Sequence, residues 1–200
     1  MAAPIVFYFD FVSPYGYLGS VGIERLAATC GRSVEWRPIL LGISVMKVMG
    51  LKPIADTPLK GDYAQHDVPR SAQFMGIAFN RCSQPMQPLA AARAFVWLNA
   101  GDPGLAKRFA QAIYQAQWAE ACDMSSADAV ADLGAGLGID RAALLAALQD
   151  DAVKDALRNQ VSAAIAAGVF GVPTFTVDGE MFWGADRLAM VEAWIKTGGW

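Results

Sequence analysis

The sequence predicts an α/β fold in which the strands lie near the two ends of the chain and helices fill the middle. Residues 4–9 form a continuously apolar run, typical of a strand buried on both faces of a mostly parallel sheet. A second strand pattern follows after one helical pattern, and two more return only from Gly171 onward. The segment between them is rich in helix formers with well-marked helix boundaries.

The first strand leads into a helix whose start is clearly marked. Residues 7–17 read Phe-Tyr-Phe-Asp-Phe-Val-Ser-Pro-Tyr-Gly-Tyr. Ser13 is a residue type that accepts hydrogen bonds from free N–H groups at a helix start, and a proline directly after it fits the first turn. Gly31 is a natural helix stop, and residues 34–41 are a plausible second strand. Strand, helix and strand in this order predict a right-handed βαβ unit with parallel strands.

The middle of the chain has a different character. Scattered Gly, Pro and Lys predict that Met46 to Arg70 is irregular, with at most short helices. Five helices are then expected, and Asp and Ser residues of the kind that cap helices precede several of them. Their expected ranges are about 88–100, 103–121, 125–137, 140–148 and 151–167.

Strand patterns return near the end, at 171–177 and 180–183. Asp178-Gly179 between them is a typical two-residue hairpin turn. A last helix is expected from Asp186 to about Lys196. Together the two ends could form one mixed sheet, a thioredoxin-like arrangement of βαβ and ββα halves. We therefore predict a discontinuous thioredoxin-like domain of residues 1–43 and 168–200, with a helical insertion of residues 44–167.

Composition and charge exclude several classes of protein. The 200 residues carry a formal net charge of -3 and no run of Lys or Arg, which argues against nucleic-acid binding. Cys30, Cys82 and Cys122 are scattered, no CxxC is present and His66 is the one histidine, so neither a metal site nor a disulfide framework is expected. Residues 159–177 are uncharged but contain Gly, Pro and amides, unlike a membrane-spanning helix. No signal peptide is recognisable, and a reducing cytoplasm fits best.

Ser13 is the first candidate for a functional residue. Its hydroxyl would lie at the positive end of a helix dipole, where any anion, including a thiolate, meets unpaired N–H groups. Lowering a thiol pKa by about two units from about 8.5 requires about 2.7 kcal/mol. One hydrogen bond to the anion together with the dipole can supply that. From the residues alone, a purely structural N-cap is the alternative.

Three segments carry a more specific signal: Phe9-Asp10-Phe11-Val12-Ser13-Pro14-Tyr15, Phe170-Gly171-Val172-Pro173-Thr174-Phe175 and Phe182-Trp183-Gly184-Ala185-Asp186-Arg187-Leu188. In this order they resemble the 2-hydroxychromene-2-carboxylate isomerases. Those enzymes belong, with the kappa-class glutathione transferases, to the disulfide-bond-A-like branch of the thioredoxin superfamily. The resemblance spans the whole chain, because the order, the spacing and the helical middle all agree.

The resemblance implies a glutathione site in which Ser13 hydrogen-bonds the sulfur. Ser13 stands where redox relatives carry the first cysteine of CxxC, and Gly16 stands at the place of the second. Dithiol chemistry is therefore excluded there, and the thiol must come from glutathione. The resemblance also implies that Pro173 is cis and that Val172 offers its backbone to the cysteinyl unit.

Three further positions complete the implied glutathione site. Backbone donors at Ala185 suit the γ-glutamyl carboxylate, Asp186 suits the ammonium, and Lys60 lies about where the family places a lysine near the glycyl carboxylate. Two positions depart from the family pattern. Leu51 stands where many relatives have an asparagine, and Ala185 replaces a frequent Ser or Asn, which leaves only backbone donors there.

The function that the resemblance implies is glutathione-dependent cis-trans isomerisation of 2-hydroxychromene-2-carboxylate or a similar aromatic enone acid, by reversible thiolate addition. The alternatives are conjugation of glutathione to an electrophile, as in kappa-class transferases, and glutathione binding without turnover. Polar contacts to the substrate could come from any of four residues: Tyr8, Arg70, Asn80 and Arg81. The natural substrate itself is not predicted. A homodimer is expected from the family only.

Overall fold

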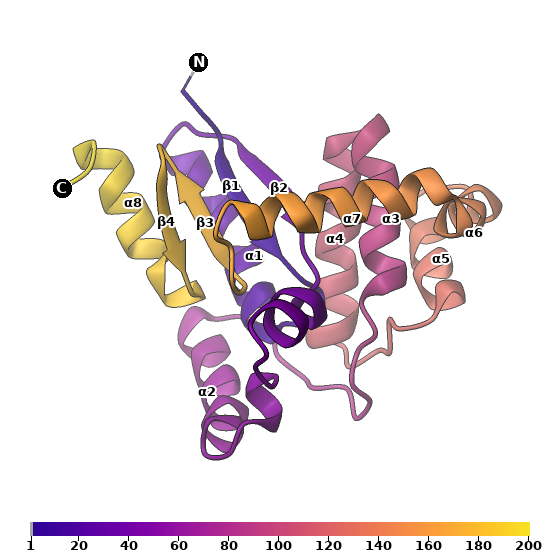
Figure 1. The fold of residues 1–200 in the computed structure, drawn as a ribbon, viewed down its shortest axis with the longest axis horizontal. Helices are drawn as coiled ribbons and strands as arrows, with labels where there is room; N and C mark the ends of the chain where they lie inside the picture. Colours follow the sequence, from indigo (N-terminus) through magenta and orange to yellow (C-terminus); the bar gives the residue numbers. More distant parts are fainter. Residues whose placement is uncertain (1) are drawn as a thin grey trace.

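The computed structural model describes residues 2–200 and has a four-stranded mixed sheet near one end of the molecule (Figure 1). The strands are β1 (Ile5–Phe9), β2 (Val34–Pro38), β3 (Thr174–Val177) and β4 (Glu180–Trp183), in the order β2-β1-β3-β4. β1 pairs with β2 in parallel, whereas β3 pairs antiparallel with both β1 and β4. The predicted βαβ and ββα halves are thus confirmed as parts of one sheet.

Helices cover both faces of the sheet. Alternate residues of β1 point to opposite faces, so Phe7 and Phe9 pack in the same core cluster as Leu18 of α1 (Pro14–Thr29). On the other face Tyr8 packs with Ala164 of α7 (Asp151–Ala166). In Figure 1 α7 passes in front of the strands and α1 lies behind them, with α8 (Leu188–Thr197) beyond β4.

The helical middle forms largely as predicted. It contains α3 (Leu89–Gly101), α4 (Pro103–Trp118), α5 (Ala127–Gly136) and α6 (Arg141–Gln149), which lie beyond the β2 edge of the sheet in Figure 1. The side chains of Asp102, Ser126, Asp140 and Asp150 each accept a hydrogen bond from a backbone N–H in the first turn of the helix that follows. The predicted division into a sheet domain and a helical insertion stays a prediction.

One expectation about secondary structure is wrong. The irregular segment predicted from Met46 to Arg70 instead contains a π-helix η1 (Gly42–Val48), a 3₁₀ turn η2 (Ile54–Asp56) and a full helix, α2 (Lys60–Met75). α2 has Pro69 in its interior and buries only Gly61, Val68 and Ala72. A helix with so narrow a buried face and an internal proline shows little apolar periodicity, so its pattern resembles that of a loop.

The final segment follows the predicted hairpin and helix. Asp178 and Gly179 have φ angles of 51° and 89°, the left-handed conformation that a tight hairpin turn requires. A short 3₁₀ turn, η3 (Ala185–Arg187), precedes α8, so the last α-helix begins slightly later than Asp186. The uncharged run 159–177 divides between α7 and β3, and no helix among residues 2–200 is long and apolar enough to span a bilayer.

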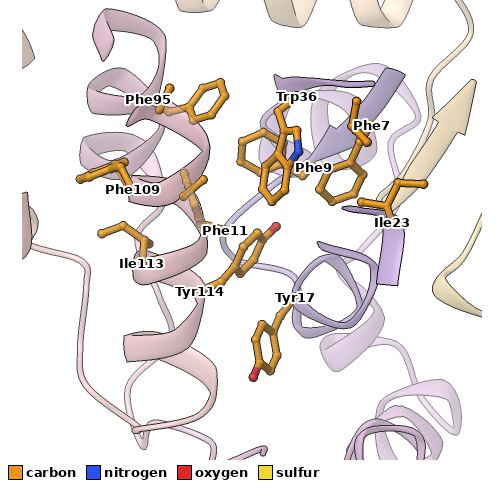
Figure 2. Close-up of a cluster of buried hydrophobic side chains, with 14 of the residues drawn as sticks. Phe7, Phe9, Phe11, Tyr17, Ile23, Trp36, Phe95, Phe109, Ile113 and Tyr114 are labelled. Atoms are coloured by element: carbon orange, nitrogen blue, oxygen red, sulfur yellow. The ribbon is translucent and has the colours of Figure 1, made fainter. Parts of the chain in front are cut away.

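An aromatic cluster joins the sheet to the helical middle (Figure 2). The fully buried ring of Phe9 lies 5.3 Å from Trp36 of β2, 5.1 Å from Phe95 of α3 and 6.1 Å from Tyr114 of α4, between ring centroids. Figure 2 shows side chains from the strands and from α4 converging on this point. The loop between β1 and α1, which carries Ser13, begins directly after Phe9 and therefore rests on this core.

Candidate active site

Ser13 caps α1 as the sequence predicts. The residue is 7% exposed, and its Oγ accepts a hydrogen bond from the N–H of Gly16 at 3.1 Å. Within residues 2–200 the hydroxyl donates to no acceptor, and the N–H of Tyr15 in the first turn also has no partner. The start of α1 therefore presents one O–H and one N–H donor, in addition to the positive end of the helix dipole.

Asp10 supports the loop that leads to Ser13. Its buried carboxylate accepts hydrogen bonds from the N–H groups of Val12, at 3.1 Å, and of Leu41, at 2.8 Å. Burial raises the pKa of Asp10 from 3.8 to about 6, although the two N–H donors act in the opposite direction. Asp10 thus links the active-site loop to the chain that follows β2, and it is ionised at neutral pH.

The raised pKa of Asp10 predicts a pH dependence of stability. Between about pH 4 and 6 the folded protein holds a proton that the unfolded chain has lost, so the free energy of unfolding falls as pH rises through this window. A shift of about two pKa units corresponds to about 3 kcal/mol. Urea unfolding from pH 4 to 8 should therefore show wild type losing about that much relative to Asp10→Asn, which does not titrate. A pH-independent difference between the two proteins would contradict the assignment.

The Val172-Pro173 peptide bond is cis, as the resemblance implies. Pro173 lies against α1, because a Cβ placed on Gly19 would be only 2.9 Å from the Pro173 Cβ. Gly19 is about 9 Å along the helix axis from Ser13, at 1.5 Å per residue. Val172 is 8% exposed, and within residues 2–200 neither its N–H nor its C=O makes a hydrogen bond. This backbone can therefore pair with an extended ligand.

The segment from Phe182 to Leu188 is tied to the cis-proline turn through Gly184. Its N–H donates to the Pro173 carbonyl at 2.9 Å, which fixes the start of η3 beside the cis-proline turn. Ala185 is half-buried in η3, whereas the Asp186 side chain is exposed and lies 3.5 Å from the Arg187 guanidinium. The fold thus packs α1, the Val172-Pro173 turn and the Ala185-Asp186 turn against one another.

Lys60 is not brought into contact with these groups. It lies exposed at the start of α2, and its side chain makes no hydrogen bond or ion pair within residues 2–200. Leu51, which replaces the family's asparagine, is also exposed. α2 is nevertheless tied to the active-site end of α1, since the hydroxyl of Tyr15 donates to Asp67 at 2.8 Å. This link was not predicted from the sequence.

Two residues of α4 hold the loop that carries Ser13, and this was not predicted from the sequence. Tyr114 donates its hydroxyl to the Asp10 carbonyl, and Trp118 donates its indole N–H to the Phe11 carbonyl, both at 3.0 Å. The available signal was the spacing of two aromatic hydrogen-bond donors four residues apart on a predicted helix, which places them on one face.

Two cavities lie outside the Ser13 loop. A cavity of about 380 Å³ is lined by residues of β4, η3 and α8 and by Trp200. A smaller one, of about 180 Å³, lies between η1 and the chain leading to β3, where Met49 and Phe170 contribute to an apolar lining. Ser13 lines neither of them. Among residues 2–200 no three His, Cys, Asp or Glu side chains gather as ligands for a metal.

Comparison with known proteins identifies the class of this fold. Residues 4–196 match the DSBA-like thioredoxin domain, so the chain is a DsbA-like protein of the thioredoxin type. A 2-hydroxychromene-2-carboxylate isomerase of Pseudomonas putida is 32% identical over 94% of this chain and 91% of its own. A solved structure of a 2-hydroxychromene-2-carboxylate isomerase superimposes with a TM-score of 0.88 at 30% identity, over 96% of this chain and 94% of that one.

A more distant relative is glutathione S-transferase kappa 1 of Rattus norvegicus, 25% identical over 92% of this chain and 87% of the transferase. The chain therefore belongs to the family of the 2-hydroxychromene-2-carboxylate isomerases, within the DsbA-like group. The family that the three sequence segments indicated is confirmed.

Proposed function

We propose that this protein is a glutathione-dependent cis-trans isomerase of 2-hydroxychromene-2-carboxylate or a similar aromatic enone acid. The observation that carries the proposal is the Ser13 hydroxyl, which lies buried at the start of α1 with its hydrogen unused. No cysteine occupies position 13 or 16, so a thiol acting there must arrive with a bound molecule. The names of the related isomerases supply the class of reaction.

The residues present fit glutathione. The unused O–H of Ser13 and the N–H of Tyr15 form a small anion site suited to a thiolate. The unpaired N–H and C=O of Val172 suit the backbone of a cysteinyl unit, in the manner of an added strand. At the other end, the exposed carboxylate of Asp186 suits an ammonium group. Lys60 would reach the glycyl carboxylate only if its free side chain extends from α2 toward α1.

Each residue has a limited part in the proposed reaction. When bound, glutathione supplies a thiolate that adds reversibly to a conjugated carbon, so that a double bond becomes a single bond able to rotate. Ser13 stabilises the ionised sulfur by donating its hydroxyl hydrogen, and the dipole of α1 adds to this effect. Val172 and Asp186 orient the peptide, so that the sulfur is held toward the substrate.

Three of the four residues considered for substrate contact already have partners in the protein. The Asn80 amide donates to the Ala119 carbonyl, Arg70 binds Asp67 and Tyr63, and the Tyr8 hydroxyl accepts from Arg37. The fourth, Arg81, is exposed. The apolar cavity beside η1 is suited to an aromatic ring by its lining.

Product analysis tests the proposal. Purified protein incubated with glutathione and the aromatic enone acid should convert the cis isomer to the trans isomer while all glutathione is recovered. A glutathione conjugate would instead support a transferase, as in the kappa-class relatives. A calorimetric titration with glutathione alone should show binding, and binding without turnover on a panel of aromatic enone acids would favour a non-catalytic role.

A further inference from the structure

The loop between β1 and α1 is held from the side by one face of α4. Tyr114 and Trp118 lie one helical turn apart, and their side chains donate to the consecutive carbonyls of Asp10 and Phe11. Both donors are buried, Tyr114 completely. Because these two hydrogen bonds are made to adjacent peptide units, they restrict both the position and the rotation of the loop that carries Ser13.

The Asp10 carbonyl connects Tyr114 to Ser13. This oxygen accepts both the Tyr114 hydroxyl, at 3.0 Å, and the backbone N–H of Ser13, also at 3.0 Å. The tyrosine therefore acts on Ser13 through a single shared acceptor. Burial, and next the Asp10 carboxylate, raise the pKa of Tyr114 well above its ordinary value of 10.0, so the hydroxyl keeps its proton and stays a donor.

The Tyr114 hydroxyl also leaves no room for a side chain at position 16. A Cβ placed on Gly16 would lie 2.6 Å from the Tyr114 oxygen, closer than real Cβ contacts occur. The next nearest atoms would be the Asp10 carbonyl oxygen at 3.2 Å and the Ser13 Cβ at 3.4 Å. The hydroxyl is thus the one severe obstacle, and its removal would leave contacts that small shifts can relieve.

We infer that Tyr114 is the positioning residue of this site: its hydroxyl holds the Asp10 carbonyl, thereby aims the Ser13 hydroxyl at the bound sulfur, and requires glycine at position 16. The inference rests on the proposed function, because it assigns Tyr114 a part in thiolate stabilisation. Tyr114 itself does not touch the sulfur. It acts only through the loop.

Tyr114→Phe removes one oxygen and leaves the ring in place. We expect kcat to fall about tenfold, because a small misplacement of a positioned group is costly. The thiol pKa of bound glutathione, followed by its ultraviolet absorbance against pH, should rise at the same time. Tyr17→Phe is the matched control. It removes a tyrosine hydroxyl that donates at 3.0 Å to the Ala78 carbonyl and to no atom of the Ser13 loop, while the ring 6.1 Å from that of Tyr114 stays in place, and it should leave kcat and the thiol pKa unchanged.

A double-mutant cycle tests the link to position 16 without any ligand. Gly16→Ala should lower the Tm markedly in the wild-type background and much less in Tyr114→Phe, where the blocking oxygen is gone. A double variant that folds when Gly16→Ala alone does not would support the link equally. Equal losses of Tm in both backgrounds would overturn it.

The outcomes separate this inference from the proposed function. If wild type binds glutathione with a lowered thiol pKa but Tyr114→Phe keeps the same pKa and kcat, the positioning inference fails and the proposed function stands. If wild type does not bind glutathione, the proposed function fails and the role of Tyr114 in thiolate stabilisation fails with it.

Discussion

Replacing Ser13 by alanine is expected to lower kcat with glutathione about 10- to 150-fold. The lost interaction is a hydrogen bond to a charged sulfur, which contributes about 1.5–3 kcal/mol. For the same reason the pKa of the bound thiol should rise by about one to two units. Ser13 also caps α1 through the N–H of Gly16, so the variant should lose about 1 kcal/mol of stability in addition.

Ser20→Ala is the matched control for this experiment. Ser20 lies within α1 and is also buried, but its hydroxyl already donates to the Tyr17 carbonyl at 2.7 Å. Its replacement should leave kcat and the thiol pKa unchanged. If Ser13→Ala lowers only stability and leaves both of these unchanged, Ser13 is a structural cap and nothing more.

Phe9→Ala is expected to have the largest effect on stability, about 3–5 kcal/mol. The ring is completely buried between Trp36 of the sheet, Phe95 of α3 and Tyr114 of α4, so the cavity left behind would border all three. Because the lost contacts join the sheet to the helical middle, both parts should be destabilised together. Unfolding should remain a single transition at a lower urea concentration.

Phe74→Ala provides the comparison for this variant. Phe74 is 92% exposed, so its replacement should change stability by less than about 0.5 kcal/mol. Circular dichroism measures mainly the helices, and tryptophan fluorescence includes Trp36 in the sheet. If the two signals already separate in wild type, the sheet and the helical middle unfold independently, and the cluster does not join them energetically.

Local features of the sequence predicted most of the fold. The Ser13-Pro14 helix start and the Asp178-Gly179 turn depend on the conformational preferences of a few adjacent residues, and both form as expected. α2 could not be predicted in this way. Only three of its residues are buried, and Pro69 lies in the helix interior. The helix therefore depends on tertiary contacts such as that between Tyr15 and Asp67.

The candidate site was predictable only in part, for a different reason. Ser13 carries a local signal, whereas Val172, Ala185 and Asp186 were identified by resemblance, and the sheet pairing is what brings them to α1. For Tyr114 the sequence offered only its four-residue spacing from Trp118, because its hydrogen-bond partner lies 104 residues away in the sequence. Such a partner becomes visible only when β1 and α4 are packed together.

The contact between Gly16 and Tyr114 also couples the loop to the distant helix α4 in any change of chemistry at position 16. A cysteine at position 16, together with one at position 13, would have the spacing of a redox-active pair. Its Cβ would lie 2.6 Å from the tyrosine hydroxyl, so that oxygen would have to move or be lost from α4. Exchanging the borrowed thiol for a dithiol of the chain's own would therefore alter the distant helix as well as the loop.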